Sequence, residues 1–94
     1  MTDLHFTWDP TKEASNRRKH GVSFDEASTL FRNLLATVLP DPTHSRREER
    51  LLIIGHSAAG RLLLVVFTER ADRIRIISAR ETSARERREY EEHS

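Results

Sequence analysis

Apolar residues in the second half of the chain are grouped into runs that have the length of β-strands. The pattern predicts strands over residues 50–56, 61–68 and 72–80, joined by short connections into an antiparallel meander. The second of these runs is apolar on both faces, so it should be a central strand covered by helices. In the last strand Ile74 and Ile76 alternate with arginines, which predicts one buried face and one basic face.

The first half of the chain begins with a short strand at 6–8 and continues into a polar helix over 10–20. Asp9 is placed to cap the start of this helix, and Gly21 is placed to end it in a left-handed conformation. The helix lacks an apolar stripe, so it is either a surface element or is kept for what its polar face does. Trp8 should anchor this region in the core.

A second helix should open directly after the first. Ser23 and Glu26 have the three-residue spacing of a capping box. The apolar residues that follow at helical spacing should lie on the sheet, and they are Phe24, Ala27, Leu30, Phe31 and Leu34. A short strand is expected next, at 36–39.

The chain closes with a helix over 81–92, which opens with a further capping box at Ser83 and Glu86. The expected element order is therefore β-α-α-β-β-β-β-α, an antiparallel meander sheet packed by helices. This is an α+β fold, and residues 1–94 should form one domain.

Composition narrows the class of protein. With 36% apolar and 33% charged residues among 94, the core is thin and the surface is crowded with ions. The chain lacks cysteine, which excludes disulfides and thiolate metal sites. It also lacks an apolar run of about eighteen residues and a signal peptide, so we expect a cytoplasmic protein that does not enter the membrane.

Charge is unevenly distributed, although the formal net charge is only +1. Cations gather in the first helix, at Lys12, Arg17, Arg18, Lys19 and His20. Such a local patch can bind a polyanion even when the whole chain is near neutral. The five histidines lack the helical spacing of a metal site, so we expect neither a metal nor a cofactor.

Several short motifs follow one another along nearly the whole chain. They are Trp8-Asp9-Pro10 with Lys12 and Asn16, the stretch from Lys19 to Ala27, the stretch from Gly60 to Thr68, the stretch from Arg73 to Arg80, and Glu86-Arg87 with Tyr90. In order and spacing they resemble the BrnT-type toxins, over about residues 6–90. The resemblance implies a ribonuclease toxin of a type II toxin–antitoxin pair, with a RelE-like fold.

The resemblance also implies partners. A BrnA-type antitoxin with a ribbon-helix-helix DNA-binding pattern would neutralise the toxin, and the complex would bind promoter DNA. The toxin itself would cut RNA without a metal and so inhibit translation and arrest growth.

Metal-free cleavage of RNA needs a base for the 2′-hydroxyl, an acid for the leaving oxygen and cations for the phosphorane. His20 and Lys19 are candidates for acid and base, because a histidine titrates near neutrality. The alternative is that His20 merely finishes its helix and Lys19 is solvated.

Arginine offers two parallel donors to a phosphate and keeps its charge. Arg70 and Arg80 are therefore candidate catalytic clamps. Arg70 could equally be a turn residue, and Arg80 could form a salt bridge with Glu81 or Glu86.

Arg61, Arg75 and Tyr90 complete the candidate RNA-binding residues, together with Lys12, Arg17 and Arg18. The two arginines could be solvated strand residues, and Tyr90 could anchor its helix to the core instead of stacking on a base. Two further functions stay open: a non-catalytic nucleic-acid-binding module, and a co-repressor scaffold for a DNA-binding antitoxin.

Overall fold

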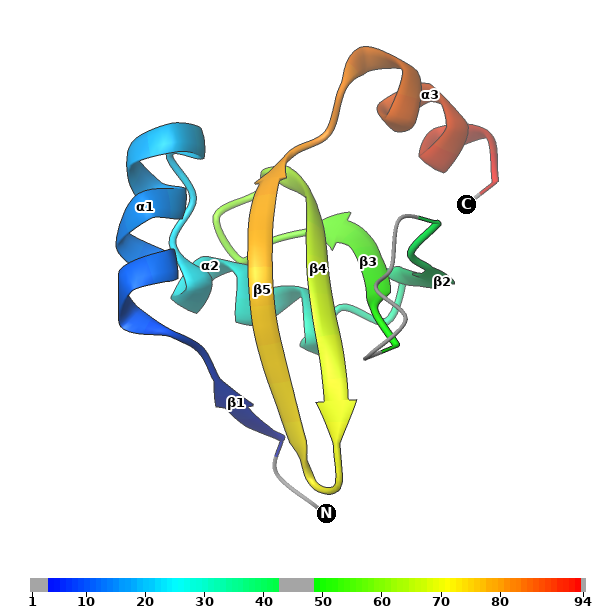
Figure 1. Cartoon of the computed structure of the whole chain (residues 1–94). Coiled ribbons are helices and arrows are strands. Elements are labelled where there is room, and N and C mark those ends of the chain that lie inside the picture. The colour runs from blue at the N-terminus through cyan, green and yellow to red at the C-terminus, as the bar shows by residue number, and fades with distance from the viewer. Residues whose placement is uncertain (1–3, 43–48, 94) are drawn as a thin grey trace.

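A computed structural model of the chain describes residues 4–42 and 49–93 and shows an α+β fold, as predicted (Figure 1). The described elements are β1 (His5–Thr7), α1 (Pro10–His20), α2 (Phe24–Ser28), the 3₁₀-helix η1 (Thr29–Arg32), β2 (Thr37–Pro40), β3 (Leu51–His56), β4 (Leu62–Arg70), β5 (Arg73–Glu81) and α3 (Ala84–Glu92). The strands form one sheet in the order β1-β5-β4-β3-β2.

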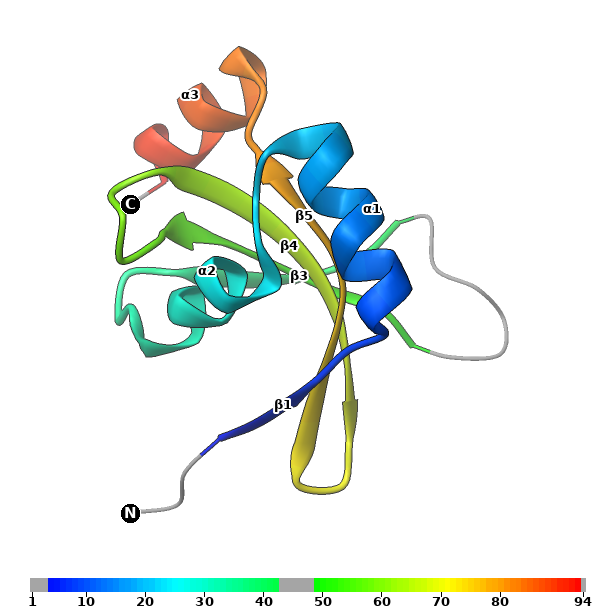
Figure 2. The ribbon, with the colours of Figure 1, turned by 90° about the vertical axis from the view of Figure 1, so that its left-hand side faces the viewer.

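The sheet is mixed, whereas the sequence pattern had predicted an antiparallel one. Strands β2 to β5 are antiparallel neighbours, which confirms the meander and the central place of β4. Strand β1 pairs in parallel with β5, over Arg73–Arg75 only. The chain then runs into α1, which lies alongside the rest of β5 (Figure 2). The connection between these two parallel strands is long, as parallel pairing requires, and contains α1, α2, η1 and strands β2 to β4.

The core lies on one face of the sheet, where α2 and η1 pack against β3, β4 and β5. Its fully buried side chains include Phe24, Leu30, Leu63, Val65 and Phe67. Trp8 packs against this core, with its ring edge-on to Phe24 at 5.9 Å between centroids, as expected. Helix α3 lies on the other side of β3 and β4 from α2 (Figure 2).

The second helix is shorter than its apolar spacing predicted. It tightens into η1 after Ser28, and Asn33 then takes an extended conformation. The Asn33 side chain accepts a hydrogen bond from the Leu35 backbone and donates one to the His56 carbonyl, so it stabilises a turn in place of a further helical turn. Leu30 is buried, but Leu34 is 99% exposed, and its predicted place on the sheet is wrong.

The predicted caps at Asp9, Gly21 and Ser83 are confirmed, although α3 begins at Ala84 and Glu81 belongs to β5. Asp9 accepts a hydrogen bond from the Thr11 backbone, and Gly21 has a φ of 70°. Ser83 and Glu86 form the full capping box of α3. At α2 only the first half of the expected motif is present in the described contacts, because the Glu26 carboxylate accepts from Arg61 and Ser57. No helix within residues 4–42 and 49–93 has the length and apolar character to cross a membrane.

The face of the sheet opposite the core, called here the open face, is basic in one part and apolar in another. Cross-strand partners point to the same face, and Leu64, Val66 and Thr68 of β4 pair with Arg80, Ser78 and Arg75 of β5. The β5 side of this open face is therefore basic. Its β2–β4 side is apolar, with Leu39, Leu52, Ile54 and Leu64.

Candidate nucleic-acid interface

Helix α1 is held against β5 by the side chain of Asn16. This buried amide donates to the carbonyl oxygens of Val22 (3.0 Å) and Ala79 (2.8 Å), and it accepts from the Ala79 N–H (3.1 Å). Because β1 pairs only with the first part of β5, Asn16 takes the place of a neighbouring strand at Ala79. The polar helix is thus positioned without an apolar stripe.

This placement gathers three of the predicted residues. Lys12, Lys19 and His20 each lie three or four positions from Asn16, so they share its face of α1, and they line a cavity of about 220 Å³ with Ser78 of β5. Two lysines and one histidine around a small polar cavity can bind a phosphate and exchange a proton with it.

Two arginines of β5 extend this basic region. Arg75 and Arg80 point to the same face as Ser78, one on each side of it along the strand. We call the set Lys12, Lys19, His20, Arg75 and Arg80 the α1–β5 surface. In this surface the cations of β5 lie beside the cations and the histidine of α1. Such a row of cations can bind successive phosphates of a nucleic-acid backbone.

Arg80 is engaged by Glu86 of α3. Its Nη1 and Nη2 donate to the two carboxylate oxygens at 2.8 Å each, so the salt bridge considered from the sequence is present. These hydrogen bonds, with further ones from Ser83, lower the pKa of Glu86 from 4.5 to about 2. The Arg80 side chain is 40% exposed, so part of the guanidinium still faces solvent beside the α1–β5 surface.

Arg70, the other candidate clamp, lies far from Arg80. Arg70 is in register with Arg73 at the turn between β4 and β5, whereas Arg80 is in register with Leu64. Six residues of β4 separate these positions, which is roughly 20 Å at about 3.3 Å per residue.

Arg61 has a structural role in the contacts that the structure describes. Its Nε donates to Glu26 at 3.0 Å, and its Nη2 donates to the Gly21 carbonyl at 3.0 Å. The hydrogen bond from Arg61 lowers the pKa of the Glu26 carboxyl. The bonds of Arg61 also tie β4 to the junction between α1 and α2, a role that the sequence did not reveal.

The other predicted RNA-binding residues lie outside the cavity. Arg17 pairs with Glu13 at 3.0 Å, and Arg18 is exposed on the side of α1 away from Asn16. The Tyr90 hydroxyl donates to the Leu35 carbonyl at 2.9 Å, so Tyr90 ties the end of α3 to the turn before β2.

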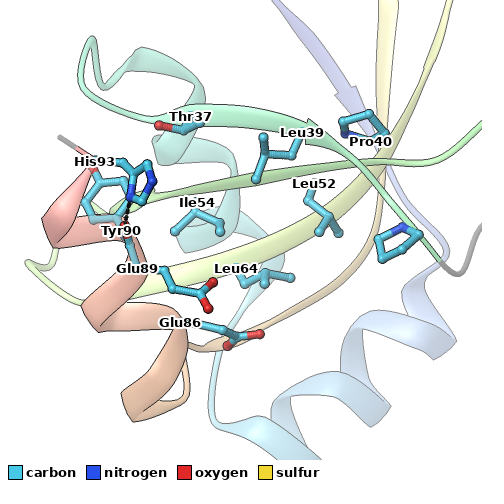
Figure 3. Close-up of a pocket in the computed structure, with 11 residues that line it drawn as sticks. Thr37, Leu39, Pro40, Leu52, Ile54, Leu64, Glu86, Glu89, Tyr90 and His93 are labelled. Atoms are coloured by element: carbon cyan, nitrogen blue, oxygen red, sulfur yellow. Dashed lines mark hydrogen bonds between the residues drawn. The ribbon is translucent and has the colours of Figure 1, made fainter.

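A second, larger cavity was missed by sequence reasoning. It is a groove of about 850 Å³ between the apolar side of the open face and α3 (Figure 3). The sequence contained a sign of this groove. Ile53 of β3 points into the core, and its neighbours Leu52 and Ile54, which must point to the opposite face, are also apolar. The spacing alone could not show that one apolar face of β3 packs in the core while the other lines a groove.

Ligands for a metal are not clustered in the part of the chain that the structure describes. No three histidine or carboxylate side chains there come close enough to hold an ion.

Fold and surface together define a small α+β protein whose cationic site suits a polyanion. The family model described as "Ribonuclease toxin, BrnT, of type II toxin-antitoxin system" matches residues 8–86. The chain belongs to this family of ribonuclease toxins, as its motifs had predicted.

A solved structure agrees with this assignment. The chain is similar to the ribonuclease toxin BrnT of Brucella abortus, with a TM-score of 0.67 and 26% sequence identity. The similarity covers 86% of this chain and 99% of the Brucella chain. No curated protein matches the chain.

Proposed function

We propose that this toxin is a metal-independent RNA endonuclease and that the α1–β5 surface is its active site. The observation that carries the proposal is the cavity that brings Lys12, Lys19 and His20 together beside Ser78. These residues come from one helix face that the sequence alone could not place against a strand. The RelE-like assignment of the fold is part of this proposal.

The reaction follows from the side chains available. The ribose 2′-hydroxyl attacks the adjacent phosphate and loses its proton to a base, while an acid protonates the leaving 5′-oxygen. His20 and Lys19 take these two roles. Arg75 and the exposed part of Arg80 offset the additional negative charge of the phosphorane. The products are a 2′,3′-cyclic phosphate and a free 5′-hydroxyl.

The partners of the toxin follow from its family. Type II toxins are paired with a protein antitoxin, and we propose a BrnA-like antitoxin with a ribbon-helix-helix domain. The complex of the two would bind promoter DNA through the antitoxin. Cleavage of RNA in the cytoplasm would inhibit translation until the antitoxin binds.

A non-catalytic role in RNA binding is favoured by one observation, the engagement of Arg80 by Glu86. A guanidinium whose two terminal nitrogens already meet a carboxylate is less able to stabilise the phosphorane, whereas the cations of α1 can still bind RNA. Cleavage assays separate this second function from the first.

The test is to incubate the purified toxin, without its antitoxin, with RNA and EDTA. Fragments that end in cyclic phosphate are expected. Lys19→Ala should slow cleavage by about 100-fold or more, because it removes a proton-transfer group. Arg18→Ala is the matched control, since it removes a neighbouring cation outside the cavity, and it should change the rate little. Intact RNA at high toxin concentration would reject the endonuclease, and equal effects of the two variants would reject this site.

A further inference from the structure

The groove beside α3 has an apolar floor and a charged wall. Leu39, Leu52, Ile54 and Leu64 lie in a row along β2, β3 and β4, and Glu86 and Glu89 of α3 stand along one side of them (Figure 3). The groove holds about 850 Å³, a volume that can take several side chains of a bound segment.

An exposed sheet face normally carries polar residues, because one face of an antiparallel sheet is usually solvated. Here the corresponding positions are leucine and isoleucine. Helix α3 does not fill the space above them, since none of its residues is buried. It is attached by polar contacts near its two ends, Glu86 to Arg80 and Tyr90 to the Leu35 carbonyl.

The charged wall selects the occupant. RNA is disfavoured, because the floor is apolar and the charged side chains that line the wall, Glu86 and Glu89, are carboxylates that already bind arginines of this chain. A cationic side chain suits the wall better. Glu89 pairs with Arg85 at 3.2 Å, and both side chains are largely exposed, at 61% and 83%. Such an exposed pair contributes little to stability, so a partner's lysine or arginine can replace Arg85.

We propose that the groove is the docking site for an amphipathic segment of the antitoxin. Its apolar side chains would rest on the floor formed by β2, β3 and β4, and a lysine or arginine would face Glu89. The inference rests on the proposed antitoxin partner. It also explains how binding could block RNA, since Glu86 belongs to the groove wall and holds Arg80 of the α1–β5 surface.

The test uses two neighbouring residues of β2 with similar exposure. Leu39 is 44% exposed and lines the groove, whereas Val38 is 51% exposed and points to the other face of the strand. The probe is the proposed BrnA-like antitoxin, purified and titrated into toxin variants. Leu39→Asp should weaken binding at least about tenfold, and Val38→Asp should leave the Kd within about threefold.

A second pair of variants tests the charge of the wall. Glu89→Lys should weaken antitoxin binding, whereas Glu91→Lys makes the same change in net charge on the other side of α3 and should not. Wild-type affinity in both Leu39→Asp and Glu89→Lys would overturn the inference. So would a toxin dimer that Leu39→Asp converts to a monomer with unchanged antitoxin binding.

RNA cleavage by the isolated variants provides an independent readout. Leu39→Asp should cleave RNA at the wild-type rate and resist inhibition by the antitoxin. If the wild-type toxin fails to cleave RNA, the proposed function fails, while the binding measurements still decide where the antitoxin docks.

Discussion

Asn16 fixes a helix whose other side chains give it no apolar means of attachment. Its amide satisfies a backbone N–H and two backbone carbonyls that would otherwise be buried without these partners. A buried polar group that loses its partner costs about 1–3 kcal/mol, whereas the net gain from a satisfied one is smaller. The position of α1 therefore depends on one side chain more than its exposed charges suggest.

Asn16→Ala should lower the free energy of unfolding by about 2–4 kcal/mol, because it leaves these groups of Val22 and Ala79 unpaired. Urea denaturation monitored by circular dichroism measures the change. Ser15→Ala, an exposed neighbour on the same helix, should stay within about 0.5 kcal/mol of the wild type. Equal stability of the two variants would show that the amide does not hold α1.

The sequence showed where the cations are but not which of them have partners. Arg61 and Arg80 looked alike as candidates for phosphate binding. Arg61 has Glu26 as its partner, and Arg80 has Glu86, which were respectively 35 and 6 residues away in the chain. Only the short-range pair could be anticipated, because a contact across 35 residues depends on the tertiary fold.

Helix α3 depends on a single carboxylate at its first turn. Glu86 accepts from Arg80 and from the Ser83 backbone, so it both caps the helix and ties it to β5. The pKa of Glu86 is lowered from 4.5 to about 2, which means that the folded chain favours the ionised form. Its contribution to stability is complete above about pH 4.5 and is lost as the pH falls toward about 2.

Acid titration of stability should therefore show a component that belongs to this pair. The loss should be about 1 kcal/mol, because the side chains of Arg80 and Glu86 are 40% and 28% exposed and water screens them. Urea denaturation at several pH values should reveal it in the wild type. Glu86→Gln and Arg80→Gln should each remove it. An unchanged acid dependence in Arg80→Gln would contradict the assignment.

Short sequence motifs predicted where helices begin and end better than they predicted which strands pair in the sheet. The caps at Asp9, Gly21 and Ser83 are set by neighbouring residues, and all three are found. The pairing of β1 with β5 joins residues about 68 positions apart, so no local pattern contains it. The prediction that Leu34 lies on the sheet was wrong for a related reason. Leu34 continues the apolar spacing of the helix, but the helix has already ended at Asn33.

At the scale of the whole molecule, the sheet separates two kinds of attachment. On one face, α2 and η1 are joined to the strands by a buried apolar core. Along the β5 edge and over the open face, α1 and α3 are joined by hydrogen bonds and ion pairs. The α1–β5 surface and the groove are both formed by the second kind of attachment.

This difference sets how each part of the protein opens. Opening of α1 exposes little apolar surface, so its free energy should depend only weakly on denaturant. Native-state hydrogen exchange should show α1 amides whose protection changes little with low urea, while β4 amides follow global unfolding. A shared steep dependence would mean that α1 and the core open together.

A helix that detaches on its own gives the enzyme two temperature limits. The proposed active site requires Lys12, Lys19 and His20 to stay next to β5, whereas the folded core requires only the sheet, α2 and η1. On heating, the toxin should therefore lose its activity before its core melts, and should regain it on cooling without having to refold.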